Sequence, residues 1–320
     1  MKLIKAIRAH FDDQGFWEVE TPILQVSPVM DTHILALKTD LKGVDKQYDK
    51  TLYLHTSPEF AMKKLMVAGI PDLYQICHVF RNADHSRLHS REFTMIEWYR
   101  TGAGYRKIMQ DCTDLLRYCA EAVEIKTYTH RDKSCDPFRD WQIISVAEAF
   151  DHYAGIDLAK WLEDKDGFRA AIGAKGMHTA EDDRWDDLFF RVMGDKIEPH
   201  LGIDVPCILY DYPVSMASLS RPKPEDPRFA ERFELYVCGI EVANAFGELT
   251  DAKIQRDRFR EELAFKEEIY GERYPVDEDF IAALEYGLPD SSGIALGIDR
   301  LAMLAAGVDE LEDVLWTPRP

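Results

Sequence analysis

The spacing of hydrophobic residues along the chain predicts helices and hairpins that do not alternate regularly. Residues 2–13 repeat apolar side chains at helical spacing, and Gly15 ends this pattern. The segments 73–80 and 91–100 are rich in β-branched and aromatic residues, and a polar connector joins them. This arrangement predicts an antiparallel hairpin with a long loop.

The rest of the chain continues this mixture of elements. In "YLHTSPEFAMKKLMVAG", Ser57 suits a helix cap, Pro58 the first helical position and Gly69 the end of the helix. Two strands are predicted to meet at Gly239, within "RFELYVCGIEVANAFGELTDA". The other predicted elements are a helix over 105–122, a strand "VPCILYDYP", helices over 252–268 and 277–286, and a final strand and helix over 291–308.

The order of these elements favours an α+β fold, in which helices flank an antiparallel sheet, over a doubly wound one. Residues from about 124 to 205 are helical and acidic in pattern, with weak strand signals. We therefore expect one domain over residues 1–320, with a mostly helical insertion at about 124–205.

Composition excludes several classes of protein. The net charge of −19 argues against an extended surface for tRNA or another nucleic acid. No run approaches the roughly 20 apolar residues of a membrane span. The six cysteines form no CxxC and no zinc-like spacing, which favours reduced thiols and a cytoplasmic location. Cys112 and Cys119 are seven residues apart in a helical pattern, which predicts two buried thiols on one helix face.

The loop of the predicted hairpin is unusually basic for an acidic chain. It carries five cationic or potentially cationic side chains, Arg81, His85, Arg87, His89 and Arg91. Arginine grips phosphate oxygens through two hydrogen bonds at once, so the loop suits a polyphosphate. The alternative is a solvated, merely charged loop.

Three acids are spaced by seven residues, Glu234, Glu241 and Glu248. The first two are expected to face each other across the turn at Gly239 and to suit Mg²⁺ beside a phosphate site. Asn244, Phe246 and Glu248 alternate, so they share one face of their strand and suit an ammonium-bearing ligand. The alternatives are solvent-facing acids and an edge strand with a polar face.

The stretch "SSGIALGIDR" places glycines at 293 and 297 in an apolar run. Glycine in a strand often marks close approach by a ligand or by another backbone. Arg300, just beyond, is positioned to stack on a base. The alternative is packing alone.

Together these segments resemble the class II aminoacyl-tRNA synthetase catalytic domain, and its lysyl branch in particular. The first helix with "FWEVETPIL" resembles motif 1, "FRNADHSRLHSREFTMIEWYR" motif 2 and "GIALGIDRLAML" motif 3. "TSPEFAMKKL" and "GIEVANAFGELTDA" resemble lysine-binding segments of that branch. The likeness covers most of the chain apart from about 124–205.

Motif 1 starts at residue 1 of the sequence, where a bacterial lysyl-tRNA synthetase is expected to carry an anticodon-binding OB domain first, so the chain looks like a member of the elongation factor P–(R)-β-lysine ligase family. That resemblance implies ATP-dependent adenylation of (R)-β-lysine or L-lysine and transfer to a lysine side chain of elongation factor P. Ala295 fits it, because lysyl-tRNA synthetases carry glycine there and the ligases alanine. A methyl group would crowd an α-amino group and favour an amine one carbon further out, by about 1–3 kcal/mol.

The resemblance also implies roles for individual residues. Arg81 and Arg300 are the expected catalytic residues, and Glu234 and Glu241 the expected ligands of Mg²⁺. The residues assigned to ATP are Arg81, Asn82, Arg87, His89, Ser90, Phe93, Glu241, Val242, Gly297 and Arg300. The residues assigned to the amino-acid substrate are Ser57, Pro58, Glu59, Glu97, Tyr99, Asn244, Phe246, Glu248 and Ala295.

Motif 2 departs from the family pattern at several positions. Ala83 replaces the usual glutamate, with Asp84 next to it, and Ser90 and Arg91 replace asparagine and proline. These changes leave open an inactive paralogue that binds nucleotide. A separate alternative is a lysine-activating enzyme with another acceptor. Motif 1 implies a homodimer built on the first helix and the strand that ends at Pro22.

Overall fold

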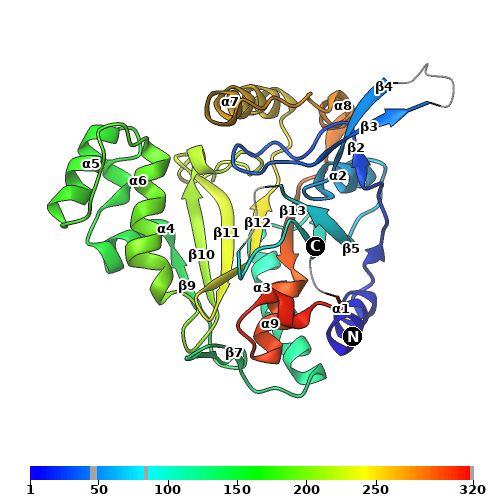
Figure 1. Cartoon of the computed structure of the whole chain (residues 1–320), viewed down its shortest axis with the longest axis horizontal. Helices are drawn as coiled ribbons and strands as arrows, with labels where there is room; N and C mark the ends of the chain where they lie inside the picture. The colour runs from blue at the N-terminus through cyan, green and yellow to red at the C-terminus, as the bar shows by residue number, and fades with distance from the viewer. Residues whose placement is uncertain (44–48, 83–85, 318–320) are drawn as a thin grey trace.

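The computed structural model describes residues 1–43, 49–82 and 86–317. Its centre is an eight-stranded sheet (Figure 1). In spatial order the strands are β1 (Trp17–Glu18), β5 (Leu73–Phe80), β6 (Glu92–Thr101), β13 (Ser291–Gly297), β12 (Ile240–Gly247), β11 (Phe229–Val237), β10 (Cys207–Pro213) and β9 (Gln142–Ser145). The six central strands pair antiparallel, and each edge strand pairs parallel with its neighbour. The α+β class with a sheet flanked by helices is confirmed.

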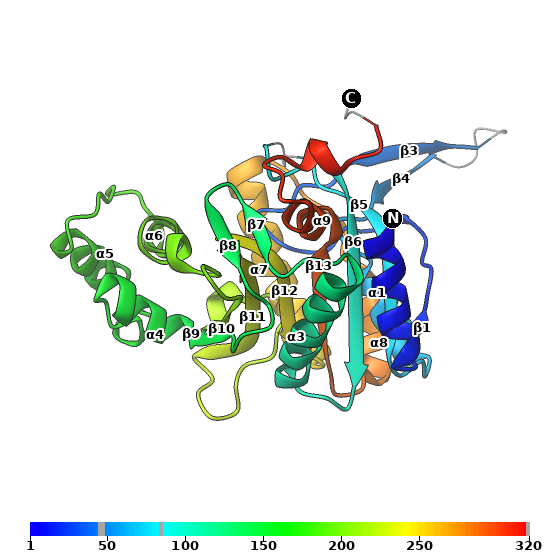
Figure 2. The same ribbon diagram turned by 90° about the horizontal axis from the view of Figure 1, so that it is seen from below.

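Side chains alternate between the two faces of the sheet along each strand, so apolar residues lie on both faces. Helices cover both of these faces. On one face, Ile96 and Trp98 of β6 belong to a core with α1 (Lys2–Asp13), α3 (Tyr105–Ala122) and α9 (Ile298–Ala306). In Figure 2, α1 and α3 run side by side. On the other face, Tyr99 belongs to a core with α2 (Glu59–Val67), α7 (Ala252–Tyr270) and α8 (Glu278–Gly287).

The predicted hairpin, the helix at 105–122 and the strands that meet at Gly239 are all confirmed. The start of α2 differs by one residue. Pro58 is the capping residue and the helix begins at Glu59, whose N–H donates to Ser57 Oγ at 3.1 Å. Gly69 follows the end of α2 with φ +99°, a left-handed turn that glycine adopts without strain.

Residues 124–205 contain short strands as well as helices. The helices are α4 (Val146–Ala149), α5 (Lys165–Ala174) and α6 (Trp185–Val192), followed by the single turns η3 (Met193–Ile197) and η4 (Glu198–His200). The strands β7 (Tyr128–His130) and β8 (Lys133–Cys135) pair with each other, and β9 joins the edge of the main sheet. The helices share a separate core with Leu209 and Tyr236 of the sheet, and they lie at one end of the molecule (Figure 1).

Three smaller features complete the fold. A small sheet has the order β2 (Leu24–Gln25), β4 (Asp49–Leu54), β3 (Lys38–Lys42). The six cysteines are free, and Cys112 and Cys119 are buried in α3, as predicted. Among the described residues, no helix combines the length and the apolar character that a membrane crossing requires.

Candidate active site

One row of side chains crosses five neighbouring strands of the sheet and carries the polar groups of the site. The registers pair Gln75 with Glu97, Glu97 with Ala295, Ala295 with Asn244, and Asn244 with Glu234. Directly paired residues project to the same face of a sheet. Ala295 therefore lies between a carboxyl group and an amide, where any larger side chain would crowd both.

The adjacent row explains the first glycine of the "GIALG" stretch. Gly293 lies between Tyr99 and Phe246 in the register. A Cβ atom at Gly293 would lie 2.3 Å from the Tyr99 ring and 2.9 Å from Glu248 Oε1. Glycine is required here because it lets a tyrosine and a carboxylate approach the backbone. At Gly297 the nearest atoms to such a Cβ belong to Arg300, at 3.8 Å or more, so the protein itself does not require that glycine.

Glu59, Lys63, Glu97, Tyr99 and Glu248 form a buried cluster, here called the amine pocket. Lys63 Nζ forms an ion pair with Glu59 and a second one with Glu248 Oε2 at 2.5 Å. The Tyr99 hydroxyl donates to Glu97 at 2.5 Å. Glu248 Oε1 is buried and has no hydrogen-bond partner among the described residues. Three carboxyl groups with one internal cation leave room for further positive charge.

The titration of the amine pocket reflects this excess of carboxyl groups. Burial, reinforced by the charge of Glu59, raises the pKa of Glu97 to about 8. Burial also raises the pKa of Glu248 to about 7, against the stabilising charge of Lys63. Burial alone would lower the pKa of Lys63, but Glu248 and Glu59 outweigh it and raise that pKa. Lys63 is therefore held in its charged form.

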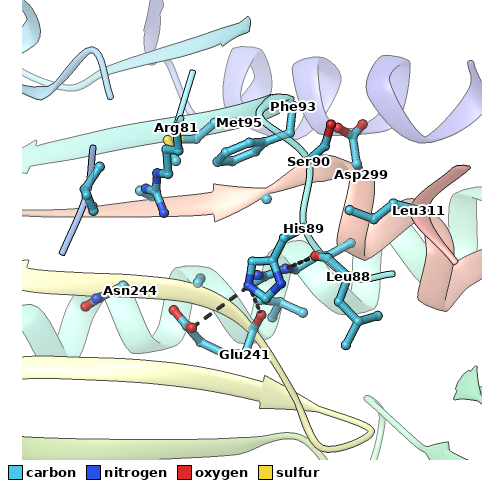
Figure 3. A pocket seen from close by; sticks show the side chains of 16 residues that line it. Arg81, Leu88, His89, Ser90, Phe93, Met95, Glu241, Asn244, Asp299 and Leu311 are labelled. Carbon is cyan, nitrogen blue, oxygen red and sulfur yellow. Dashed lines mark hydrogen bonds and ion pairs between the residues drawn. The ribbon is translucent and has the colours of Figure 1, made fainter. Parts of the chain in front are cut away.

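A cavity of about 130 Å³ lies next to the amine pocket on the same face of the sheet. It is lined by eight of the ten residues that the sequence assigned to ATP, namely Arg81, His89, Ser90, Phe93, Glu241, Val242, Gly297 and Arg300, and also by Asn244 and Ala295. Figure 3 shows Arg81 and Phe93 on one side of the cavity and Glu241 and Asn244 on the other. We call this space the nucleotide cavity.

Two arginines are held at fixed places in this cavity. The Arg81 guanidinium lies 5.3 Å from the centre of the Phe93 ring. Arg300 donates to the carbonyl oxygen of Glu241 at 2.6 Å and to that of Leu88 at 3.2 Å. Both cations are thus presented to the space where an anion would bind.

Asn82 and Arg87 do not line the cavity. Arg87 forms an ion pair with Glu310 at 3.2 Å, and its carbonyl oxygen accepts from the N–H of Leu311, in the last turn η6 (Leu311–Val314). Asn82 is exposed, and its carbonyl oxygen accepts from Arg91 Nε at 3.0 Å.

Of the remaining motif 2 residues, Ser90 and His89 line the cavity, and three others lie outside the described residues. Ser90 is buried and lines the cavity. His89 is exposed, and its Nδ1 lies 2.8 Å from Ser86 Oγ. Ala83, Asp84 and His85 lie outside the described residues.

The expectation that Glu234 and Glu241 face each other across the turn at Gly239 is wrong, because the strand register does not pair them. A bulge between Leu235 and Tyr236 pairs Glu241 with Tyr236, whereas Glu234 pairs with Asn244. The bulge adds one residue to β12, which turns Glu241 to the same face as Asn244 although the two are three positions apart. The two glutamates are therefore diagonal neighbours rather than directly opposed.

Glu234 and Glu241 have different hydrogen-bond partners, and these partners indicate which carboxylate is available to bind Mg²⁺. Glu234 accepts hydrogen bonds from Tyr212 at 2.6 Å, Tyr236 at 2.7 Å and Arg232 at 2.7 Å. Among the described residues, Glu241 has an ion pair with Arg300 Nη1 at 4.0 Å, and partial burial with the nearby Glu234 charge raises its pKa. The described residues contain no group of three or more metal-binding side chains. One or two carboxylates together with phosphate oxygens are, however, the usual site of nucleotide-bound Mg²⁺, so Glu241 fits it, with Glu234 beside it held by its own donors.

Sequence reasoning missed Lys63 and Arg232. Lys63 lies four residues after Glu59, the spacing of an ion pair on one helix face, and this signal was available. Arg232 contacts Glu234, and its Nε donates to Asn244 Oδ1 at 3.3 Å. Its alternation with Glu234 along β11 was the available signal.

The fold and the site define a class of protein. The chain matches the family of class II tRNA synthetases (D, K and N) over residues 1–320. ATP use follows from membership of this family.

The chain is also similar to curated enzymes named elongation factor P–(R)-beta-lysine ligase. It is 38% identical to the one from Edwardsiella ictaluri over 316 residues, covering 98% of this chain and 91% of the relative. The enzyme from Proteus mirabilis is 38% identical over 320 residues, covering 99% and 93%. The one from Avibacterium paragallinarum is 38% identical over 314 residues, covering 98% and 92%. The chain therefore belongs to the class II tRNA synthetase family and, within it, to the group that these ligases form.

Proposed function

We propose that this protein is a ligase that activates (R)-β-lysine, or lysine, with ATP and transfers it to a lysine side chain of elongation factor P. The observation that carries the proposal is the amine pocket, in which three buried carboxyl groups surround one internal cation beside a nucleotide cavity. Lysine and β-lysine each carry two ammonium groups, which compensate the remaining carboxylates. The relatives' names supply the acceptor.

In the first step, a carboxylate oxygen of the amino acid attacks the α-phosphorus of ATP. The bond from that phosphorus to the bridging oxygen breaks, and pyrophosphate leaves with the electron pair. Arg81 and Arg300 supply fixed positive charge to the phosphates, so catalysis rests on positioning and electrostatics. The attacking carboxylate is already ionised and needs no base. Glu241, with Glu234 behind it, would hold Mg²⁺, which neutralises phosphate charge.

In the second step, the neutral ε-amine of the acceptor lysine attacks the carbonyl carbon of the acyl-adenylate. An amide bond forms, the bond from that carbon to the phosphate oxygen breaks, and AMP leaves. The amine loses one proton to solvent.

We propose that Ala295 favours the β-amino acid. Its methyl group lies between Glu97 and Asn244 in the register, on the face that holds the substrate residues. The methyl reduces the space beside the substrate's α-carbon, where an α-amino group would bind. One methyl group discriminates by about 1–3 kcal/mol, so it biases the choice without making it absolute.

The test is the intact mass of elongation factor P after incubation with the protein, ATP, Mg²⁺ and either (R)-β-lysine or L-lysine. A gain of one lysyl unit, larger with the β-isomer, supports the proposal. Lysine-dependent pyrophosphate exchange without a mass gain moves the acceptor elsewhere, and a tRNA-charging control examines one such acceptor. Silence in all three assays indicates the inactive paralogue.

A homodimer built on α1 and the following strand is part of this proposal. Trp17, Ile23 and Leu24, which lie just after α1, are exposed by 60%, 41% and 40%. Apolar side chains gathered on one segment of surface favour an interface. Analytical ultracentrifugation of the protein and of Trp17→Glu tests it, because the charged residue should shift the dimer toward monomer.

A further inference from the structure

A second and larger cavity opens beside the nucleotide cavity. It encloses about 640 Å³. The two cavities share Ile34, Arg81, Glu241 and Asn244 in their linings. The larger cavity therefore begins where the nucleotide and amino-acid ends of the site meet, and it leads from there to the insertion. We call it the insertion cleft.

Three separate segments form the outer walls of the insertion cleft, namely the insertion around α5 and α6, the loop that holds residues 31–34, and helix α7. Residues 215–218 and the strands β11 and β12 also line it. His33 joins all three, because its Nε2 lies 3.8 Å from Asp186 of α6 and its Nδ1 lies 3.1 Å from the Tyr270 hydroxyl of α7. The Arg184 guanidinium lies 4.2 Å from the centre of the Phe265 ring. The insertion is thereby held against the opposite wall, and the cleft keeps a defined shape.

The lining of the cleft is acidic toward the outside. Of its six carboxylates, Glu234 and Glu241 belong to the inner end, and the other four, Asp31, Glu163, Asp186 and Glu262, line the rest of the cleft. Of its three arginines and lysines, Arg81 and Arg232 lie at the inner end, beside Asn244, and only Lys165 belongs to the insertion. A wall with this charge attracts a cation and repels phosphates.

Aromatic side chains complete the outer wall. Trp185 and Phe190 of α6 line the cleft together with Phe265 of α7. Phe190 is exposed by 49%, although large aromatic residues are normally buried. An exposed aromatic beside carboxylates suits the aliphatic stem and the ammonium group of a lysine side chain.

We propose that the insertion cleft is the entrance for the acceptor and receives a lysine-bearing surface segment of the partner protein. The carboxylates attract the ammonium group, the aromatic side chains contact its stem, and the path ends at Glu241 and Asn244, where the acyl-adenylate forms. This inference rests on the proposed function and assigns to the insertion the recognition of the protein substrate. A nucleic-acid acceptor is disfavoured here, because its phosphates would meet the outer carboxylates.

The test separates the two steps of the reaction in the full-length protein. Phe190→Ala and Glu163→Lys change the outer wall and none of the residues that line the nucleotide cavity. Each has a matched control on the same stretch of chain. Phe138→Ala removes an aromatic side chain exposed by 42%, and Asp182→Lys reverses an exposed charge; neither residue lines the cleft. Lysine-dependent pyrophosphate exchange reports the first step, and the initial rate of modification of purified elongation factor P reports the second.

We expect Phe190→Ala and Glu163→Lys each to raise the KM for elongation factor P about tenfold, while pyrophosphate exchange stays within about twofold of the wild type. Both controls should match the wild type in both assays. Added salt should raise the KM of the wild type more than that of Glu163→Lys, because screening removes the attraction of the outer carboxylate.

Three results overturn the inference. Wild-type KM in both cleft variants means that the acceptor enters elsewhere. An equal loss of pyrophosphate exchange and of modification means that the cleft serves the nucleotide or the folding of the protein. A wild-type protein that exchanges pyrophosphate but never modifies elongation factor P removes the proposed function together with the inference, and this failure is recognised before any variant is made.

Discussion

The amine pocket and the insertion cleft both adjoin the nucleotide cavity, but the charged groups of the pocket are buried and paired, whereas the outer wall of the cleft presents charge to solvent. In the amine pocket, Glu59, Lys63 and Glu248 are almost fully buried and bind one another. In the outer wall of the cleft, the Glu163 carboxylate is exposed to solvent. A buried charge costs several kcal/mol unless a partner compensates it, whereas an exposed one costs little. The pocket therefore links substrate recognition to the stability of the fold, and the cleft does not.

The two regions also differ in what holds them. The amine pocket is built from α2, β6 and the residue after β12, elements that belong to or pack on the central sheet. The cleft is walled by a loop, a helix and an insertion with its own core. Substitutions in the pocket should disturb folding and activation together, and substitutions in the outer wall of the cleft only the transfer step.

Replacing Lys63, the buried cation of the amine pocket, is the strongest test of the difference between the two regions. Lys63→Met leaves Glu59 and Glu248 without their internal partner, so it should lower the free energy of unfolding by about 3–5 kcal/mol at pH 8. Urea unfolding measures it. Lys2→Met is the control, because Lys2 pairs with Glu124 on the surface, where both side chains are mostly exposed, and should cost about 1 kcal/mol or less. Equal stability of the two variants would contradict the pocket's dependence on Lys63.

Filling the space at Gly293 comes next in expected size. In Gly293→Ala the new methyl group collides with Tyr99 and Glu248, so pyrophosphate exchange should fall about 100-fold in kcat/KM. Gly173→Ala in α5 is the matched control, because a Cβ there meets nothing within 4 Å. That variant should keep wild-type exchange and gain up to about 1 kcal/mol in stability. Full activity in Gly293→Ala would show that the close approach is dispensable.

The free protein should lose stability as the pH rises. The pKa of Glu97 is about 8 in the folded chain, above its ordinary value, so the folded state binds the proton more tightly than the unfolded one. The stabilisation is complete below the unfolded pKa and disappears as the pH passes 8. We expect a loss on the order of 2 kcal/mol between pH 5 and 9, followed by chemical unfolding. Glu97→Gln should flatten this dependence, and an unchanged slope in that variant would refute the assignment.

The smallest effect is expected at Ala295. Ala295→Gly should raise kcat/KM for L-lysine relative to (R)-β-lysine about tenfold in pyrophosphate exchange, because the removed methyl frees space for an α-amino group. The unfolding free energy of the variant should change by no more than about 1 kcal/mol. An unchanged ratio would mean that the choice between the isomers is made elsewhere in the pocket.

The local pattern of the sequence was enough to predict the main elements. The hairpin of β5 and β6, helix α3 and the strand at 291–297 were predicted correctly, because apolar spacing and glycine position act over a few neighbouring residues. Glycine 293 was recognised as a point of close approach, and the neighbours that require it, Tyr99 and Glu248, were already among the predicted substrate residues.

Three features needed the tertiary structure. The bulge beside Tyr236 turns Glu241 to the face of Asn244, and regular alternation along β12 predicts the opposite face. Arg87 belongs to the basic loop, but it pairs with Glu310 and does not line the nucleotide cavity. The strand β9 joins the main sheet from within a segment whose pattern is mostly helical.

By itself, then, the sequence determined where helices and strands form and which motifs the chain carries, since both depend on residues that are near one another in the chain. Only the tertiary structure decided that Lys63 of one helix balances Glu248 beyond a distant strand, and that the insertion closes a cleft against α7. Contacts of this kind form when segments that are distant in the sequence pack against the same sheet. The spacing of neighbouring residues in the chain does not show which distant segments will meet.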